Sequence, residues 1–227
     1  MIDFSSLKDI TIPEGVVTSI MCGDTVLWQK KQASPYKREL AYLESTGTQW
    51  IETGLIFKYA PYSIKIKFKS TDYITSATSG YYIGAMNNCS RGIGIKKSNA
   101  DTILIRDYSN TNTVVEAPSE EWDEVFVNRK EMTVTANGVT AKLNSFRWYD
   151  GNPVSYALFG TRRYNSTTVV QSGIAKCAIA YCQLFDDGLN LVRDFIPVLD
   201  WDDVPCMYDK VSGELFYNRG TGEFLYE

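Results

Sequence analysis

The sequence contains no histidine among its 227 residues. Without histidine the chain cannot form a Ser-His-Asp triad, a Cys-His catalytic pair or a zinc site with a histidine ligand. Any enzyme built from this chain would have to work with carboxylates, lysine or tyrosine. Glycoside hydrolysis is then the enzymatic class to consider, because it needs only two carboxylates.

Other missing features narrow the function further. No apolar stretch approaches the length needed to span a bilayer, and the N-terminus lacks the basic and then apolar segment of a secretion signal. The net charge of −4 provides no basic field for a phosphate backbone, so nucleic acid is not expected as the main partner. The sequence indicates no cofactor.

The five cysteines are odd in number and lack the spacing of metal ligands. We therefore expect buried free thiols rather than a disulfide framework, which suits synthesis in a reducing cytoplasm. Cys177 and Cys182 are five residues apart on one expected strand, so the strand pleat predicts that they point to opposite faces.

What the sequence does contain is a series of short strand patterns separated by turn residues. In segment 62–69, Ile64, Ile66 and Phe68 alternate with three lysines, which predicts a strand with one buried face and one solvated, basic face. Further strands are expected at Tyr81–Ala85, Gly92–Lys96, Thr102–Arg106, Ala157–Gly160, Gly173–Phe185 and Leu191–Val198, with a closing hairpin in Met207–Phe224 that turns at Ser212-Gly213. Without a convincing long amphipathic helix, this pattern predicts an all-β sandwich or barrel.

The strongest local signal is Asn137-Gly138, because a two-residue type I′ hairpin turn needs positive φ at both central positions. A chain folded there places the apolar residues of both strands on one face, so turn chemistry and hydrophobic register agree. The predicted pairs are Ala136 with Val139, Val134 with Ala141, and Met132 with Leu143.

Two domains are expected. Residues 1–34 read as a small β unit plus linker, in which Cys22-Gly23-Asp24 turns a hairpin between segments 16–21 and 25–28. A lone hairpin is marginal in water, so we expect this unit to act as an anchor that docks on something else. The polar stretch 29–35 is the linker, and the sandwich occupies residues 35–227.

Several stretches carry a resemblance to known proteins. A Trp-led strand at 121–127, the Asn137-Gly138 hairpin and a strand ending in Phe159-Gly160 follow one another in the order typical of the laminin-G-like, concanavalin-A-like jelly roll, which the chain resembles. The segments 43–54, 191–198 and 208–218 look like sandwich domains of tail and other virion proteins of phages and prophages of gut Firmicutes and relatives. Segment 7–28 is similar to a small module of the same proteins.

The resemblance implies an antiparallel jelly-roll β-sandwich with a small N-terminal β-hairpin module. It also implies a structural protein of a phage or prophage virion, made in the bacterial cytoplasm, that contacts other virion proteins through the N-terminal module. A homo-oligomer or symmetric assembly is expected, since virion proteins usually occupy symmetric assemblies. The expected ligand is host-surface carbohydrate, and the tail, a fibre or capsid decoration are the alternative locations.

Carbohydrate binding directs attention to loops that combine aromatic rings with amide, carboxylate and guanidinium groups, because sugars present flat C–H faces beside hydroxyls. Binding residues also concentrate on loops. Two loops, 145–152 and 161–166, have this composition, and 86–91 is a third. The candidate ligand-binding residues are Trp148, Tyr149, Asp150, Asn152, Arg162, Arg163, Tyr164, Asn165, Asn88 and Arg91, whereas Trp28, Trp50 and Trp122 are assigned to packing.

The acidic clusters favour no catalytic site. The Glu-x-Asp-x-x-Glu strand of jelly-roll glucanases is absent, and the acids around Trp122 are interpreted as solvated residues at the start of a strand whose pleat separates neighbouring acids. Stretches 186–188 and 200–203 are expected to be turns. Because carboxylate-rich loops suit calcium, which laminin-G-like relatives bind, calcium binding stays open here, although the acids do not have the spacing of a known calcium-binding motif. The alternatives are a carboxylate-dependent glycoside hydrolase and a structural decoration protein without a ligand.

Overall fold

The computed structural model describes residues 10–12, 15–17, 19–22, 25–29, 34–57, 62–71, 80–87, 91–107, 112–119, 121–144, 153–164 and 168–227. The chain divides into two compact units, Met1–Ser34 and Pro35–Glu227. The elements within the described ranges are all strands, and no helix there has the length and hydropathy required to cross a bilayer.

The first unit contains two antiparallel strand pairs. β1 (Ile10–Ile12) pairs with β2 (Gly15–Val17), and β3 (Ser19–Cys22) pairs with β4 (Thr25–Gln29). The hairpin predicted around residues 22–24 is confirmed, because Cys22 is paired with Thr25. The single strand predicted over 16–21 is instead divided between β2 and β3, since Val16 and Val17 pair back onto β1.

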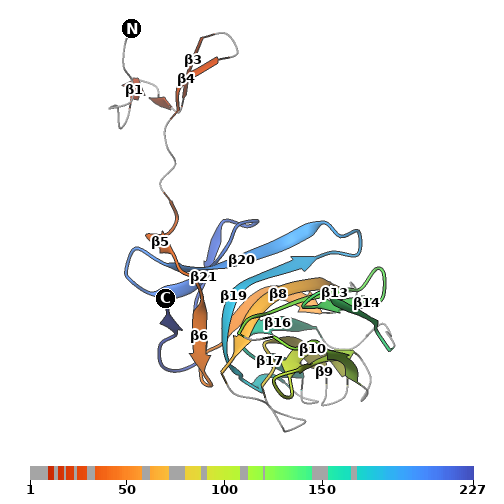
Figure 1. The fold of residues 1–227 in the computed structure, drawn as a ribbon. Helices are drawn as coiled ribbons and strands as arrows, with labels where there is room; N and C mark the ends of the chain where they lie inside the picture. Colours follow the sequence, from red (N-terminus) through yellow and green to blue (C-terminus); the bar gives the residue numbers. More distant parts are fainter. Residues whose placement is uncertain are drawn as a thin grey trace. The chain divides into compact units, whose positions relative to one another are not determined.

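The second unit is a β-sandwich (Figure 1). One sheet runs β12-β11-β10-β9-β16-β7, with β17 paired to β9 and β18 paired to β17. All of its described pairings between strands are antiparallel except that of β17 with β9, which is parallel. Its strands are β7 (Ile51–Phe57), β9 (Ile83–Asn87), β10 (Arg91–Lys97), β11 (Thr102–Asp107), β12 (Asn112–Glu116), β16 (Val154–Leu158), β17 (Thr161–Tyr164) and β18 (Val169–Ser172).

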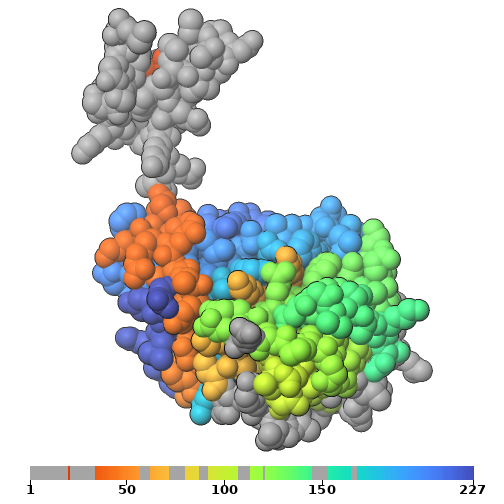
Figure 2. All heavy atoms as spheres, in the orientation of Figure 1, coloured from red at the N-terminus to blue at the C-terminus, as the bar shows by residue number. Residues whose placement is uncertain are grey.

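The other sheet runs β15-β14-β13-β8-β19-β20-β21-β22, with β5 on β20, and β6 between β19 and β23. The C-terminal strand lies beside β6 near the start of the domain (Figure 2). The strands of this eleven-stranded sheet are β5 (Arg38–Glu39), β6 (Leu43–Thr46), β8 (Ser63–Ser70), β13 (Asp123–Asn128), β14 (Thr133–Ala136), β15 (Val139–Lys142), β19 (Lys176–Phe185), β20 (Leu191–Leu199), β21 (Pro205–Asp209), β22 (Glu214–Phe216) and β23 (Leu225–Tyr226).

The core lies between the two sheets, and β8 shows how the sequence places it there. Ile64, Ile66 and Phe68 are fully buried, as their alternation predicts. The Phe68 ring packs at 4.2 Å on that of Tyr82, which precedes β9 of the facing sheet. Each such aliphatic or aromatic side chain contributes about 1.5–3 kcal/mol through burial.

The lysines of β8 lie on the outer face, as predicted, but they are not simply solvated. Lys65 pairs with Glu124 at 3.1 Å, and Lys69 pairs with Glu121 at 2.7 Å. The Lys67 amino group lies 5.9 Å from the Trp122 ring centre. Two of the three lysines are therefore paired with carboxylates on this outer face, and the third lies near an aromatic ring.

The Asn137-Gly138 hairpin is confirmed in turn and register. Both residues have positive φ, +48° and +84°, as a type I′ turn requires. The two predicted pairs nearest the turn are present, and the Leu143 amide donates to the Met132 carbonyl at 3.0 Å. The face is only partly buried, because β15 is the sheet edge and leaves Val139 exposed.

The strands predicted in the remaining segments are present as β9, β10, β11, β16, β19 and β20, and the closing hairpin is formed by β21 and β22 around Gly213. The strand expected to end at Gly160 ends at Leu158. Phe159 has a φ of +62°, which turns the chain from β16 into β17.

The cysteine prediction is half right. Cys177, Cys182 and Cys206 are buried free thiols, and burial raises the pKa of each. The prediction that Cys177 and Cys182 point to opposite faces is wrong. The register between β19 and β8 shifts between Ile179 and Tyr181, so the two cysteines pair with Ser70 and Ile66 and both face the core. A β-bulge adds a residue to one strand and resets the alternation.

The prediction that the acids around Trp122 are solvated is wrong for Asp123. The pleat separates Asp123 from Glu124 as expected, but Asp123 is buried rather than solvated. Lys97 on β10 donates to Asp123 at 2.7 Å, and Ser119 and Asn137 donate to the same carboxylate at 2.7 and 2.8 Å. This buried network joins the two sheets at the turn of the Asn137-Gly138 hairpin.

Candidate functional site

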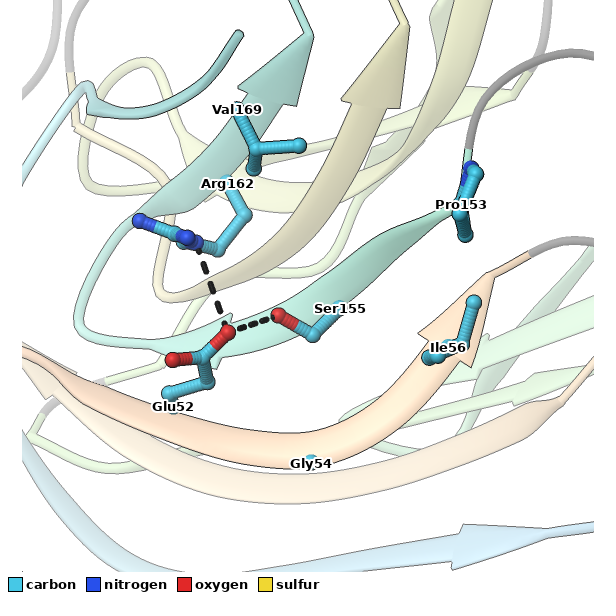
Figure 3. Close-up of a pocket in the computed structure, with 7 residues that line it drawn as sticks. All are labelled: Glu52, Gly54, Ile56, Pro153, Ser155, Arg162 and Val169. Carbon is cyan, nitrogen blue, oxygen red and sulfur yellow. Dashed lines mark hydrogen bonds and ion pairs between the residues drawn. The ribbon is translucent and has the colours of Figure 1, made fainter.

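A pocket of about 240 Å³ opens on the outer face of the eight-stranded sheet. Figure 3 shows Glu52, Ser155 and Arg162 meeting at one side of it, with apolar side chains opposite and above. The lining residues come from β7, β16, β17 and the start of β18, and are Glu52, Gly54, Ile56, Pro153, Ser155, Arg162 and Val169.

An irregularity between β7 and β16 shapes the pocket. Ala157 pairs with Glu52 and Ser155 pairs with Ile56, so two steps along β16 match four along β7. Gly54 lies within the extra length with a φ of +72°, a conformation that glycine adopts without strain. The side-chain oxygen of Thr53 donates to the Tyr156 carbonyl at 2.9 Å and fixes the irregular segment to β16.

The polar side of the pocket is built around the Glu52 carboxylate. The Ser155 hydroxyl donates a short hydrogen bond to Glu52 Oε1, and Arg162 Nε lies 3.6 Å from the same oxygen. That separation makes an ion pair but not a hydrogen bond, and Arg162 Nε has no hydrogen-bond partner among the described residues. Both side chains keep some contact with solvent, at 33% exposure for Glu52 and 19% for Arg162.

Arg162 is also held from beneath by Trp50, whose ring centre lies 5.2 Å from the guanidinium carbon. Trp50 is in turn fixed by the C-terminal segment. Its amide donates to the Asn218 side chain at 3.2 Å, and its carbonyl accepts from the Arg219 amide at 2.8 Å. Trp50 is buried, as its assignment to packing predicts, but it also supports the pocket.

The predicted binding loop 161–166 is largely a strand. Thr161–Tyr164 form β17, whose parallel pairing with β9 is not visible in the local sequence. Arg162 lines the pocket, and its ligand-binding role stays a prediction. Arg163 does not line it, and Tyr164 packs against the core, so the structure does not bring the three together.

The other predicted site residues are not described in side-chain detail. Trp148, Tyr149, Asp150, Asn152, Asn165 and Asn88 lie outside the described residues. Arg91 is placed as the first residue of β10 rather than in a loop, by its pairing with Asn87. The ligand-binding roles of these residues stay predictions.

Sequence reasoning missed Glu52, Ser155 and the apolar lining. Glu52 lies in a strand with ordinary alternation of polar and apolar residues, about a hundred residues from its partner Ser155. The signal that could have marked it is its place two residues before Gly54, a glycine in the interior of the strand. The strand register needed to bring these residues together is a tertiary property.

Within the described ranges, no group of three or more acidic or cysteine side chains is placed to hold a metal ion. The predicted turns at 186–188 and 200–203 are present, and their first carboxylates are occupied locally. Asp186 accepts from the Asn190 amide at 2.8 Å, and Asp200 accepts from the Val204 amide at 2.8 Å. Calcium binding stays a prediction.

No protein-family model and no curated protein matches this sequence. Two solved structures to which the chain is similar are of the Ruminococcus gnavus IT-sialidase CBM40, one of them bound to alpha2,3 sialyllactose. The first is 15% identical with a TM-score of 0.39, over 68% of this chain and 92% of that one. The second is 14% identical with a TM-score of 0.39, over 63% and 91%. The fold described above rests on the sheets of this chain itself.

Proposed function

We propose that this protein is a non-catalytic carbohydrate-binding β-sandwich whose site is the pocket on the outer face of the eight-stranded sheet. The observation that carries the proposal is the meeting of Glu52, Ser155 and Arg162 beside the apolar side chains that line the pocket. Sugars need this combination, because their hydroxyls donate and accept hydrogen bonds while their C–H faces prefer apolar contacts.

The size of the pocket favours a single sugar unit. Sites for drug-sized ligands enclose about 300–1,000 Å³, and this pocket is smaller, at about 240 Å³. Its apolar side is formed by Ile56, Pro153 and Val169. These features support recognition of one residue of a longer glycan, with the remainder of the glycan outside the pocket.

The absence of catalysis is part of the proposal. Canonical glycoside hydrolysis uses two carboxylates that flank the scissile bond, about 5–10 Å apart. The described lining of the pocket contains one carboxylate, Glu52, and that group is engaged by Ser155 and Arg162. This arrangement favours binding over hydrolysis.

The cellular setting is proposed on the sequence resemblance. The sandwich would be displayed on a phage or prophage virion, with unit 1–34 docking on neighbouring virion proteins and the pocket meeting host-surface glycan. Flanking tail, baseplate or capsid genes, and electron microscopy of virions labelled for this chain, test that setting. A gene neighbourhood without virion genes would contradict it.

A glycan array tests the binding function. Wild type is expected to bind a defined set of glycans, and Arg162→Met is expected to lose most of that binding. Lys142→Met, which removes an exposed cation from the sheet edge at β15, serves as the matched control and should bind like wild type. Silence of wild type across the array would contradict carbohydrate binding and favour a structural protein without a ligand. Release of sugar from polysaccharide by pure wild type would instead establish a glycosidase.

A further inference from the structure

The charge of the pocket restricts its ligand. Among the described lining residues, Glu52 and Arg162 are the charged groups, one of each sign. They lie 3.6 Å apart, so the fields of the carboxylate and the guanidinium largely cancel for a ligand in the pocket. An anionic ligand would gain from Arg162 but would be repelled at similar distance by Glu52.

The hydrogen-bonding capacity points the same way. Glu52 as a carboxylate only accepts, and Arg162 only donates. Arg162 Nε is enclosed by protein, so the donors that a ligand can reach are the other nitrogens of the partly exposed guanidinium. A hydroxyl group both donates and accepts, so two hydroxyls on neighbouring carbons of a sugar can donate to Glu52 and accept from Arg162 at once. A carboxylate in the same position could accept only from Arg162 and would be repelled by Glu52, so a sugar acid is disfavoured wherever its carboxylate enters the pocket.

The two groups are also held in place before a ligand arrives. Ser155 donates to Glu52, and the Trp50 ring lies beneath Arg162. Restricting these side chains in advance lowers the entropy lost when a ligand binds.

We propose that the pocket selects neutral sugars through a vicinal pair of hydroxyls and discriminates against sugar acids. This inference rests on the proposed carbohydrate-binding function and specifies its ligand class. Glu52 is the specificity-determining residue, because it excludes an acid, and Arg162 is the donor that receives the second hydroxyl.

The test compares neutral glycans with acids of the same ring. Pairs of oligosaccharides that end in galactose or galacturonic acid, and in glucose or glucuronic acid, are titrated against the full chain by calorimetry. The neutral member of a binding pair is expected to bind about 10- to 100-fold more tightly, the size of a hydrogen bond to a charged group. Binding is expected to change little between low and high salt, because the ligand is neutral.

Substitution of Glu52 tests the origin of the preference. Glu52→Gln leaves Arg162 without a counter-charge, so neutral glycan should bind more weakly and acid glycan more tightly, with a new salt dependence. Glu131→Gln makes the same change of net charge at an exposed turn of the other sheet and should leave the preference unchanged. Thermal unfolding of each variant shows that it is folded.

The possible outcomes distinguish failure of the neutral-sugar inference from failure of carbohydrate binding itself. Equal affinity of wild type for the two members, preference for the acid member, or an unchanged preference in Glu52→Gln would overturn the neutral-sugar inference while carbohydrate binding stood. Equal binding of a neutral glycan and its deoxy analogue at every ring hydroxyl would overturn the vicinal-hydroxyl contact. Binding of no glycan in either class would overturn the proposed function and this inference together.

Discussion

Two ion pairs of the sandwich, each between a carboxylate and a basic side chain, differ in their surroundings. Lys97 and Asp123 lie 2.7 Å apart with side chains 4% and 1% exposed, and Ser119 and Asn137 also donate to the carboxylate. Glu52 and Arg162 lie 3.6 Å apart on the edge of a pocket and remain partly exposed. The first pair is surrounded by protein and saturated with partners, while the second keeps capacity for a ligand.

The difference shows what makes a charged pair a site. A buried charge must have its hydrogen bonds supplied by the protein, because the cost of desolvation is otherwise uncompensated. Asp123 meets this condition, because Lys97, Ser119 and Asn137 all donate to its carboxylate, which is enclosed and cannot bind a ligand. Arg162 lies beside its partner at a distance too long for a hydrogen bond, and its guanidinium keeps some contact with solvent, where a ligand could also reach it. Partial exposure, rather than charge, distinguishes the pair of the proposed site from the buried pair.

Breaking the buried pair should have the largest effect on stability. Asp123→Asn leaves the Lys97 ammonium buried without its counter-charge, and the expected loss is about 3–5 kcal/mol in the free energy of unfolding. Chemical denaturation measures it. Asp187→Asn, at the exposed β19–β20 turn, is the matched control and should be nearly neutral. A loss below 1 kcal/mol in Asp123→Asn would contradict the structural role of the pair.

The turn residue attached to this network should come next. Asn137 donates to the Ala117 carbonyl at 2.9 Å and accepts from the Glu124 amide at 2.9 Å, in addition to its bond with Asp123. Asn137→Ala removes these bonds and places alanine at positive φ, so we expect a loss of about 1–3 kcal/mol. Asn137→Gly removes the bonds but tolerates the φ, so it should lose less. Equal losses in the two variants would show that the backbone conformation contributes nothing.

The pocket pair should behave in the opposite way to the buried pair. Arg162→Met is expected to change the free energy of unfolding by less than about 1 kcal/mol, because partly exposed ion pairs contribute little. The same variant should lose about ten-fold or more in affinity for glycan. Parallel denaturation and binding titrations make the comparison. A variant as unstable as Asp123→Asn would place Arg162 in the structural class and contradict the assignment of a site.

The smallest effect on stability is expected from an ion pair on the outer face of the eleven-stranded sheet. Lys69 and Glu121 lie 2.7 Å apart, but their side chains are 40% and 61% exposed. Lys69→Ala should leave the free energy of unfolding close to that of wild type and should not alter glycan binding. Denaturation and titration of this variant provide the baseline for the other two pairs. Loss of glycan binding here would move the site to the outer face of the eleven-stranded sheet.

The parts of the fold that the sequence predicted are those with local causes. The alternation of Ile64, Ile66 and Phe68 with lysines sets the faces of β8, and Asn137-Gly138 sets both the turn and the register of its hairpin. The errors arose where strand pairing overrides the local pattern. A bulge turned Cys177 and Cys182 to the same face, and pairing with β9 made a strand of Thr161–Tyr164.

Of the predicted ligand-binding residues, Arg162 lines the pocket of the proposed site, and its binding role stays a prediction. Arginine beside aromatic and amide residues suits sugar recognition, which is the local signal that marks Arg162. Its partners could not be predicted, since Glu52 and Ser155 meet only through the irregular register of β7 and β16. The inward direction of Asp123 follows the pleat, but its burial depends on Lys97 from the facing sheet.

The most direct test of the central claim is an NMR titration of the full chain with a glycan from the array. The account predicts that the amide shifts caused by the ligand concentrate on β7, β16 and β17 around Glu52, Ser155 and Arg162, and that they vanish in Arg162→Met. Shifts confined to the outer face of the eleven-stranded sheet, or unchanged in Arg162→Met, would contradict it.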